Sequence, residues 1–427
     1  MKFIFLRIRN FLDFMWFGIK VGNIDIFALI VDLGILIYTF TDFDSLFATN
    51  NLLILFFLIF INVIWQIYST VKASHDYYRR LNCFSTSVGV SKDYKFDNQL
   101  SGHYYILTIK EIGMAVLISP DINDILRKSK INCRYTSSKR KRVNKYIRTH
   151  KDTLLKFLNY KWHSMADKGG AFYNESKLCM ASELYENRRP DGSYMLALCK
   201  GNYYNSYLTN NIYSICLNES GFIIEAPRNV RNYQIKQFSD SEFGDHIGVS
   251  TIIISSDGYA FIMRHNNKTA LFTNELLPSA SGSADYSDYN KADDFKTVII
   301  KAIERELEEE TRIKKNVINE TIVTGFYRCL HRGGKPEFCC LTYLNIDRID
   351  VQEIIIPDNK EQSEEIHPVK LSANDRNDFI TISDFIKANI AECSLPLYMT
   401  YYMMLNYYGK EADIGYRCSI GEQITSL

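Results

Sequence analysis

The sequence lacks several features that would narrow its function at once. Its 50 Lys and Arg residues nearly balance 49 Asp and Glu residues, so the net charge of +1 gives no overall attraction to a nucleic-acid polymer. The ten cysteines include no Cys-x-x-Cys pair and no cluster with histidine, which argues against a zinc site and favours reduced thiols. No catalytic triad, internal repeat or low-complexity tract is present, and isolated histidines such as His163 and His246 are expected to be structural. What remains is a chain of 427 residues, long enough for two or three domains.

Two long apolar runs distinguish the N-terminal region from the rest of the chain. They cover residues 24–40 and 52–68, and each approaches the ~20 residues that a helix needs to cross a bilayer. Lys and Arg lie before the first run and after the second, whereas residues 41–51 between them carry only Asp. The positive-inside rule then predicts a transmembrane hairpin with both termini and the main domain in the cytoplasm. Asp32, inside the first run, indicates either a polar-lined assembly of several subunits or a protonated side chain bonded within one hairpin.

A block of positive charge follows this region. Residues 127–151 contain Lys and Arg but no Asp or Glu, with Lys139-Arg140-Lys141-Arg142 at the centre. Such a block creates a local positive potential despite the neutral total charge. Contact with lipid headgroups, binding of a ligand phosphate and a solvated helix face all remain open as its role.

Apolar periodicity indicates the elements of the remaining chain. Strands are expected at residues 104–109, 114–118, 193–198, 203–217, 248–254, 259–264, 321–330 and 338–344. Asp257-Gly258 predicts a hairpin turn, and so does Arg332-Gly333-Gly334-Lys335. Helices are expected at residues 295–310, 383–390 and 395–408.

The helix over residues 295–310 carries the clearest chemistry. Its apolar residues recur at helical spacing, so one face is expected to enter a core. Glu306, Glu309 and Glu310 project together from another face, because residues three and four apart are neighbours on a helix. Hard oxygen ligands of this kind suit Mg²⁺ or Mn²⁺ beside a phosphorylated ligand, although a solvated acidic face is the alternative.

The order of residues in this helix resembles the second half of the Nudix box, Arg-Glu-apolar-x-Glu-Glu-x-Gly-apolar. The matching residues are Arg305, Glu306, Leu307, Glu309, Glu310 and Ile313. Arg312 stands where the family has its glycine. The first half departs further, because Lys291 and Thr297 occupy the positions of the family's earlier glycine and glutamate.

A glycine does occur earlier, in the segment 277–283, which is followed by an insertion rich in Asp and Tyr. A strand hairpin, a glycine loop and an acidic helix follow one another in the order that the Nudix resemblance implies. The expected fold is therefore α+β, with a two-helix transmembrane hairpin and a cytosolic Nudix-like α/β/α sandwich. The expected domains are residues 1–80 as membrane hairpin, 81–240 as a basic connecting region and 241–427 as the Nudix-like domain.

Two membrane spans joined to a divergent Nudix domain resemble the transmembrane-Nudix effectors of cyclic-oligonucleotide-based anti-phage systems (CBASS). The resemblance implies a sensor in the bacterial inner membrane that binds a cyclic nucleotide made by a partner synthase, oligomerises and disrupts the lipid bilayer. Nucleotide contacts are then expected from the glycine loop and the strand before it, at Ser279, Ser281, Gly282, Ser283 and Arg264.

The alternative is a membrane-anchored Nudix hydrolase of a nucleoside diphosphate derivative. Glu306, Glu309 and Glu310 would then hold Mg²⁺ or Mn²⁺, with Glu309 as the catalytic candidate and Arg305 orienting the glutamates. The departures at Lys291 and Thr297 weigh against hydrolysis, while the three glutamates favour it. The sequence therefore leans towards a sensor that is not an enzyme and leaves hydrolysis open.

Overall fold

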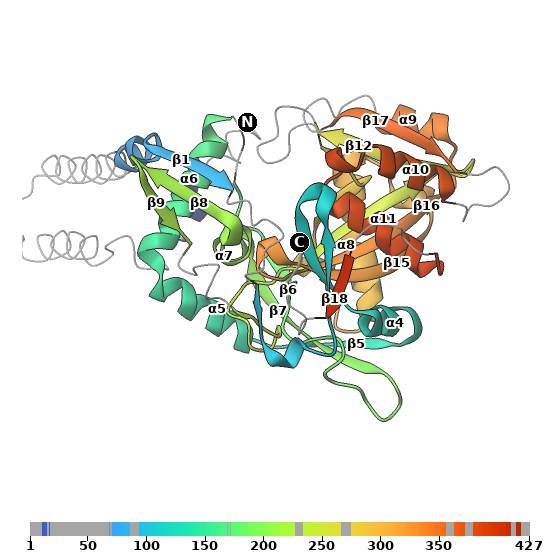
Figure 1. The fold of residues 1–427 in the computed structure, drawn as a ribbon, viewed down its shortest axis with the longest axis horizontal. Helices are drawn as coiled ribbons and strands as arrows, with labels where there is room; N and C mark the ends of the chain where they lie inside the picture. The colour runs from blue at the N-terminus through green and yellow to red at the C-terminus, as the bar shows by residue number, and fades with distance from the viewer. Residues whose placement is uncertain are drawn as a thin grey trace, which may run out of the picture. The chain divides into compact units, whose positions relative to one another are not determined.

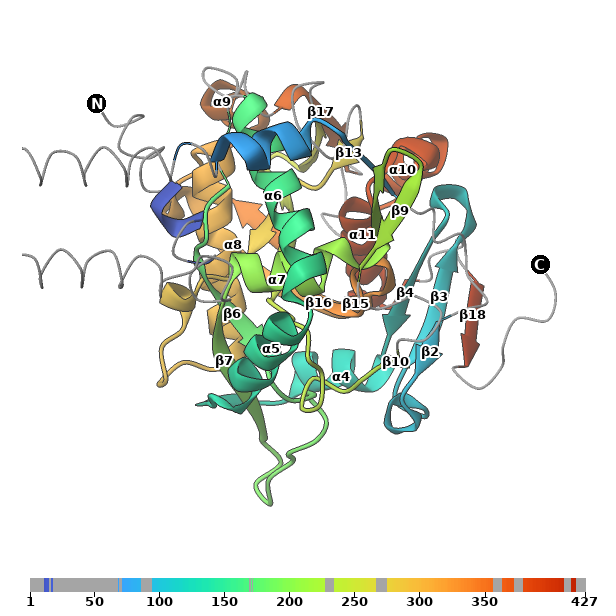
Figure 2. The same ribbon diagram turned by 90° about the vertical axis from the view of Figure 1, so that its left-hand side faces the viewer.

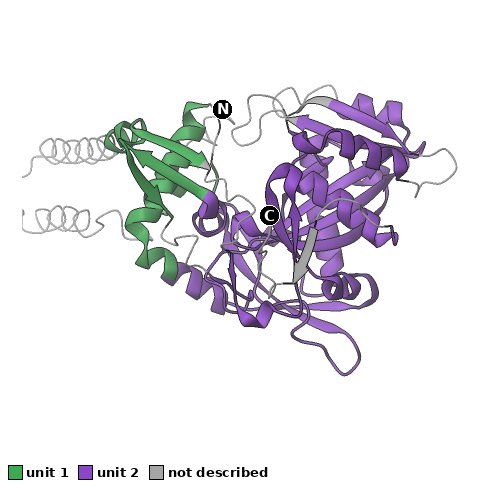
Figure 3. Ribbon diagram, in the orientation of Figure 1, with its two compact units in different colours: residues 1–85, 146–174, 215–227 green, residues 86–145, 175–214, 228–427 purple. Residues whose placement is uncertain are grey.

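The protein's fold was analysed in a computed structural model. The structure describes residues 11–14, 17, 68, 71–85, 94–168, 170, 172–226, 234–265, 275–355, 363–371, 379–410 and 416–419. The chain divides into two compact units, which are coloured separately in Figure 3. Unit 1 comprises residues 1–85, 146–174 and 215–227, and unit 2 comprises residues 86–145, 175–214 and 228–427.

Unit 1 is a small α+β unit. Its elements are β1 (Leu81–Ser85), α6 (Lys151–Asp167), β8 (Ile215–Glu219), β9 (Phe222–Glu225) and a helix over residues 71–78. The strands form an antiparallel sheet in the order β1-β8-β9. The helix over 71–78 contacts α6 through a hydrogen bond of 2.9 Å between Ser74 Oγ and His163 Nε2. Burial and the nearby His75 lower the pKa of His163 to about 4, which agrees with the structural role expected for this histidine.

Unit 2 contains a mixed sheet of ten strands as its largest element (Figure 1). Its strands are β3 (Tyr105–Ile109), β4 (Met114–Ile118), β11 (Gly248–Ile254), β12 (Tyr259–His265), β13 (Leu276–Leu277), β14 (Ala280–Ser283), β15 (Ile318–Cys329), β16 (Lys335–Leu344), β17 (Ser363–Lys370) and β18 (Tyr416–Ser419). The main path runs β13-β12-β11-β16-β15-β4-β3-β18, with β14 paired to β11 and β17 paired to β12. Strands β11 and β16 are parallel, and the other strand pairs described in this sheet are antiparallel. Figure 2 shows β4, β3 and β18 side by side at one end of the sheet.

In its described residues, unit 2 also contains a second sheet, a pair of short strands and seven helices. A second sheet has the order β5-β7-β6, and two short strands pair as β10-β2. These strands are β2 (Lys95–Phe96), β5 (Ile131–Tyr135), β6 (Ser176–Met180), β7 (Tyr194–Asn202) and β10 (Gln234–Ile235). The helices are α4 (Pro120–Lys128), α5 (Ser138–Thr149), α7 (Tyr203–Thr209), α8 (Phe295–Thr311), α9 (Arg348–Ile355), α10 (Ile380–Ala388) and α11 (Leu395–Tyr407), and the division between the units falls within α5. Short 3-10 turns lie at η1 (Asn98–Leu100), η2 (Lys110–Ile112), η3 (Asn211–Ser214), η4 (Tyr286–Asp288), η5 (Lys315–Val317), η6 (Leu330–Arg332) and η7 (Ile390–Glu392).

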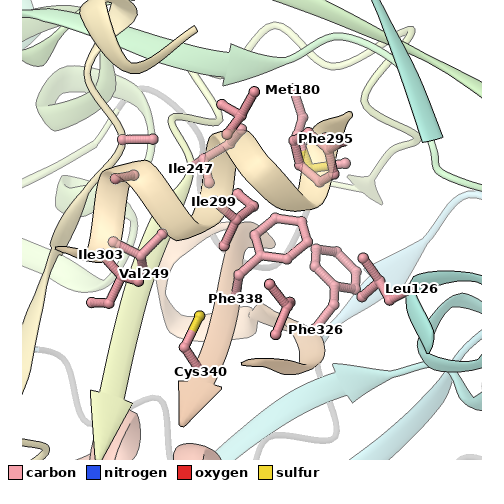
Figure 4. Close-up of a cluster of buried hydrophobic side chains, with 14 of the residues drawn as sticks. Leu126, Met180, Ile247, Val249, Phe295, Ile299, Ile303, Phe326, Phe338 and Cys340 are labelled. Carbon is pink, nitrogen blue, oxygen red and sulfur yellow. The ribbon is translucent and has the colours of Figure 1, made fainter. Parts of the chain in front are cut away.

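Alternation along the central strands creates two cores, one on each face of the large sheet. Val249 of β11 and Phe338 of β16 belong to the core that includes α8, as the close-up in Figure 4 shows. Ile252 of β11 and Leu341 of β16 belong to the core that includes α10 and α11. Successive side chains of a strand point to opposite faces, so the fully buried strands β11 and β16 serve both layers. The α/β/α arrangement expected for this region is therefore present in unit 2.

The predicted transmembrane hairpin is wrong, and so is the multi-pass inner-membrane location that depended on it. Across the described ranges, no helix is long and apolar enough to cross a bilayer. The longest described helices, α6 and α8, have 17 residues each and carry several charged side chains, so neither has the length and apolarity that a span requires. Residues 24–40, including Asp32, and residues 52–67 lie outside the residues that the structure describes.

Most of the other expected elements are confirmed. The strands at 248–254 and 259–264, the strand pair around Gly333-Gly334, and the helices near 295–310 and 395–408 all occur within a few residues of the expected bounds. The strand expected at 203–217 is wrong, because this segment forms α7 and η3 before β8 begins. Asn202 explains the difference: its side chain accepts a hydrogen bond from the Asn205 backbone N–H and so caps a helix where Tyr-rich composition had indicated a strand.

Candidate functional site

Helix α8 is anchored by an apolar face and two specific ends. Phe295, Ile299 and Ile303 are fully buried in the core on this side of the sheet. At the start of the helix the Asp294 side chain accepts a hydrogen bond of 2.9 Å from the Lys296 backbone N–H, which satisfies one of the free donors there. The buried face fixes the rotation of the helix, so that Glu306 and Glu310 face β14.

The helix ends at Arg312, the residue that stands at the glycine position of the Nudix pattern. Its backbone has φ 65°, in the left-handed region, and its N–H donates to the Glu308 carbonyl at 2.9 Å. Glycine adopts this conformation without a steric penalty, whereas a residue with a Cβ does not. The helix therefore ends in a conformation that glycine would adopt more readily than Arg312.

Strand β14 closes over the acidic face of α8, which we define as Glu306, Glu309 and Glu310. The Ser283 backbone N–H donates to Glu306 Oε1 at 3.0 Å, and the Ser281 backbone N–H donates to Glu310 Oε2 at 2.9 Å. Between them, a Cβ added at Gly282 would lie only 2.1 Å from Glu306 Cδ. Glycine is therefore required at 282 for steric reasons, because the strand and the carboxylate approach so closely.

Arg305 ties the acidic face to the segment that precedes the helix. Its Nε and Nη2 donate to the two carboxylate oxygens of Asp288 at 3.1 and 3.0 Å, a bidentate arrangement. Nη2 also donates to the Ser283 carbonyl at 3.0 Å. Nη1 donates to Glu306 and to Glu309, at 3.1 Å in each case. One guanidinium thus holds together a loop, a strand and the helix.

Asp288 is the functional residue that sequence reasoning missed. The Nudix pattern predicts an acid eight residues before Arg305, where this chain has Thr297. Arg305 instead contacts an acid 17 residues earlier, on η4. The available signal was the insertion rich in Asp before the helix, but the sequence alone did not show which of its carboxylates turns towards Arg305.

Burial changes the protonation of the acidic face. Desolvation is the main cause that raises the pKa of Glu310 to about 8, and the neighbouring Glu306 and Glu309 raise it further. Desolvation also raises the pKa of Glu306, although Arg305 opposes this shift. Burial disfavours the charge on Arg305, but Asp288 and Glu306 outweigh it and raise the pKa of the guanidinium. Near neutral pH, Glu310 is therefore largely protonated.

The acidic face as the structure places it does not fit a three-carboxylate metal centre. In the described part of the chain, no three His, Cys, Asp or Glu side chains come together at positions that could hold a metal ion. Glu306 and Glu310 are turned to the β14 amides, while the side chain of Glu309 is 60% exposed beside Arg305.

The residues expected to contact a nucleotide are divided between two places. Ser281, Gly282 and Ser283 lie on β14 against the acidic face. Ser279 is 2% exposed. Its hydroxyl accepts a hydrogen bond from the Ile253 N–H and donates one to the Phe261 carbonyl, so it links the backbones of β11 and β12. Arg264 forms an ion pair of 2.8 Å with Glu392. The structure therefore brings the three β14 residues to the acidic helix and gives Ser279 and Arg264 other contacts.

The basic block at residues 127–151 is not a uniform positive surface. The side chain of Lys139 is 0% exposed and forms an ion pair of 2.6 Å with Asp245. Arg142 donates to the Ser239 carbonyl. Arg140 and Lys141 are exposed. At least two of the four central cations are thus committed to internal contacts of unit 2.

Comparisons with known proteins find only weak similarity. No family model and no curated protein matches the sequence. Among solved structures, the fold is similar to that of DR0079 from Deinococcus radiodurans, with 16% identity, a TM-score of 0.24 and coverage of 34% of this chain and 79% of the other. A NUDIX hydrolase from Nitrosomonas europaea gives 19% identity, a TM-score of 0.24 and coverage of 39% and 90%. The C. elegans Ap4A hydrolase gives 17% identity, a TM-score of 0.21 and coverage of 38% of this chain and 96% of the other. Nudix hydrolases are thus among the structural neighbours of this chain, with a weak likeness that extends over a minority of its length.

Proposed function

We propose that the Nudix-like region of unit 2 is a sensor that binds a nucleotide without turning it over. The finer proposal is that the ligand is a cyclic nucleotide made by a partner synthase in an anti-phage response of the CBASS type. The resemblance in Arg305 to Ile313 and in the glycine segment before it supports the nucleotide. The arrangement of the carboxylates supports binding rather than hydrolysis.

The observation that carries this proposal is the closed acidic face. Two of its three carboxylates accept hydrogen bonds from β14 amides, at 3.0 Å for Glu306 and 2.9 Å for Glu310. Burial raises the pKa of Glu310 to about 8, so this carboxyl group is a poor ligand for a cation at neutral pH. The region is built as a pre-organised surface of hydrogen-bonding groups, which favours recognition of a ligand with little rearrangement.

A sensor also needs an output, and we propose that ligand binding favours self-association of the chain. A ligand shifts an equilibrium between two states only by the difference between its affinities for them. The nucleotide would therefore bind the associated state more tightly than the isolated chain. Light scattering of the purified protein with and without ligand would measure this shift directly.

The test of the main proposal uses the purified full chain with a panel of cyclic di- and trinucleotides, with and without Mg²⁺. Binding heat and ligand integrity are followed together. We expect one cyclic nucleotide to bind and to be recovered intact. The substitution Gly282→Ala should weaken this binding, because a Cβ there displaces Glu306.

Hydrolysis is the second candidate, and the exposure of Glu309 favours it. This side chain is 60% exposed and contacts Arg305 at 3.1 Å, so it is free to turn towards a ligand-borne cation. Breakdown of a nucleotide that requires Mg²⁺ and disappears in Glu309→Gln would establish the hydrolase and contradict the sensor. Glu308→Gln is the matched control, since Glu308 is an exposed neighbour outside the acidic face.

A further inference from the structure

A second polar group lies where β6, η6, β16 and the residues before β11 meet in unit 2. We define it as the His246 cluster: Lys177, His246, Arg332 and Lys335. His246 forms an isolated bridge with Cys179 of β6. Two residues later, a Cβ added at Gly248 would lie 2.4 Å from Lys335 Nζ, so the ammonium group passes directly over this strand. The cluster therefore draws together four segments that are distant in the sequence.

The imidazole of His246 is the unusual member of the cluster. Its residue is 3% exposed, and its Nδ1 has no hydrogen-bond partner in the described part of the chain. An unpaired polar atom in a buried position costs about 1–3 kcal/mol, so such atoms are rare unless a ligand or another group satisfies them. The Tyr203 ring lies beside it at 6.0 Å between centroids and offers no replacement for a hydrogen bond to Nδ1.

Three cations lie near this imidazole, each paired with a carboxylate. Desolvation first, and then the charges of Lys335, Lys177 and Arg332, lower the pKa of His246 well below its ordinary value. The carboxylates of the neighbourhood bind the same cations: Glu337 lies 2.5 Å from Lys335 and 3.7 Å from Arg332, and Lys177 lies 2.6 Å from Asp285 and 2.9 Å from Glu175. Three cations thus act on one neutral ring that has an unused nitrogen.

We infer that the His246 cluster binds a phosphate group, and that in the proposed sensor this is a phosphate of the nucleotide. Phosphate oxygens accept charge-assisted hydrogen bonds from Lys and Arg and can also accept from an imidazole N–H at Nδ1. An anion here supplies further acceptors to these cations and satisfies the unpaired nitrogen at the same time. The side chain of Arg332 is 27% exposed, which connects the cluster to solvent. His246 is therefore a binding residue, contrary to the structural role expected from its isolation in the sequence.

The cluster adjoins the acidic face of α8, so one ligand can reach both. Asp285 accepts from Lys177 at 2.6 Å and lies 3.9 Å from Arg305 Nη2. Ser283 of β14 pairs with Gly248, and Gly248 pairs with Glu337 in the same row of the sheet. A nucleotide that contacts β14 would place a phosphate over this row. The nucleotide identity depends on the proposed function, whereas the phosphate site depends on the cluster alone.

The test measures binding of inorganic pyrophosphate and of inorganic phosphate to the full chain by calorimetry. The variant His246→Phe keeps a ring next to Tyr203 and removes an unpaired polar atom. Its free energy of unfolding should therefore stay the same or rise, while pyrophosphate affinity falls about tenfold or more. Arg332→Met, at a partly exposed side chain, should lower the affinity for pyrophosphate by a similar factor. Lys291 is an exposed cation outside the cluster, so Lys291→Met should leave the affinity for pyrophosphate unchanged.

Several outcomes overturn the inference. The inference is wrong if the wild-type protein binds no pyrophosphate. It is also wrong if His246→Phe and Arg332→Met both bind pyrophosphate with the wild-type affinity. If His246→Phe unfolds the protein, Arg332→Met alone decides. A cyclic nucleotide that binds wild type and both variants equally would leave the proposed function standing and remove this site. Binding of pyrophosphate that depends on His246 and Arg332, together with no cyclic-nucleotide binding, would keep the phosphate site and remove the proposed function.

Discussion

Two groups of charged residues in unit 2 have opposite characters. The first, which we call the Phe238 network, contains Lys139 paired with Asp245 and Arg328 paired with Glu183, and both cations lie close to the Phe238 ring. All four side chains are at most 1% exposed. The second is the acidic face of α8 with the adjoining His246 cluster, where Glu309 is 60% exposed and His246 Nδ1 has no partner.

The difference lies in how completely the polar atoms are satisfied. In the Phe238 network, Glu183 accepts from Arg328, Tyr104 and the Phe238 backbone, at 2.9, 2.6 and 3.2 Å. Asp245 accepts from Lys139 at 2.6 Å and from the Asn210 side chain at 3.0 Å. A buried network with its bonds complete fixes one packing arrangement and leaves nothing for a ligand. The comparison teaches that buried charge alone does not mark a binding site, since a complete set of partners leaves no group for a ligand to contact.

The largest effect is expected from Lys139→Met in the Phe238 network. It leaves the Asp245 carboxylate buried without its cation, which should lower the free energy of unfolding by about 3–5 kcal/mol. Lys141→Met, two residues later on the exposed face of α5, should change it by less than about 0.5 kcal/mol. Urea denaturation of both variants measures the contrast. Similar losses in the two variants would show that Lys139 has no special role.

The same pair predicts an acid limit to stability. Burial disfavours the charged form of Asp245, but Lys139 outweighs it and lowers the pKa of this carboxyl group below its ordinary value. A lowered folded-state pKa contributes stability that is present above about pH 4 and is lost as the pH falls below it. The wild-type protein should lose this contribution in acid, and Lys139→Met should show a smaller loss.

The next effect concerns the contact between β14 and α8. Gly282→Ala places a Cβ 2.1 Å from Glu306 Cδ, so either the strand or the carboxylate must shift. We expect a loss of about 1–3 kcal/mol in stability. Ser281→Ala keeps the backbone N–H that binds Glu310 and serves as the control. Equal stability of the two variants would contradict the close approach of Gly282 to the Glu306 carboxylate.

A smaller and pH-dependent effect is expected at Glu310. Burial raises the pKa of its carboxyl group to about 8, so the folded state keeps a proton that the unfolded state releases near pH 4.3. The wild type should therefore lose stability between about pH 4.3 and about pH 8, as the unfolded state binds fewer protons. Glu310→Gln carries no titrating group there and should gain about 1–2 kcal/mol over wild type by pH 8, less than the full shift because of partial exposure.

Denaturation of wild type and Glu310→Gln at several pH values measures this gain. The difference between the two proteins should be close to zero in mild acid and should grow steadily towards pH 8. Glu308→Gln, at an exposed position of the same helix, should show no such trend. If the difference in stability between wild type and Glu310→Gln stays constant with pH, the Glu310 carboxyl group does not keep a proton in the folded state.

The fold and the site differ in how far the sequence could predict them. Periodicity located β11, β12, β15, β16, α8 and α11, because each has a buried face whose spacing is local. The order of residues also singled out the glutamates of the acidic face and Gly282, but it did not show that Gly282 packs against Glu306. Asp288 was not found, because its contact with Arg305 joins positions whose spacing no local rule fixes.

The His246 cluster was missed for the same reason. Its members come from β6, η6, β16 and the residues before β11, and each is unremarkable in its own stretch. The burial of Lys139 was hidden by its neighbours, since a run of four cations indicates a solvated surface until tertiary contacts turn one of them inward. Charge patterns along the chain therefore identified where polar groups occur, but not which of them are satisfied.

The smallest expected effect sharpens the comparison at the end of α8. Arg312 adopts φ 65° where the Nudix pattern has glycine. Arg312→Gly should relieve the steric penalty of a Cβ in the left-handed region and stabilise the protein by about 0.5–1 kcal/mol. Arg312→Ala keeps the Cβ and should give no such gain, which separates backbone strain from loss of the arginine side chain. Equal stability of the glycine and alanine variants would mean that the helix end is not strained. The departure from the pattern at 312 would then have no energetic consequence for the glutamates before it.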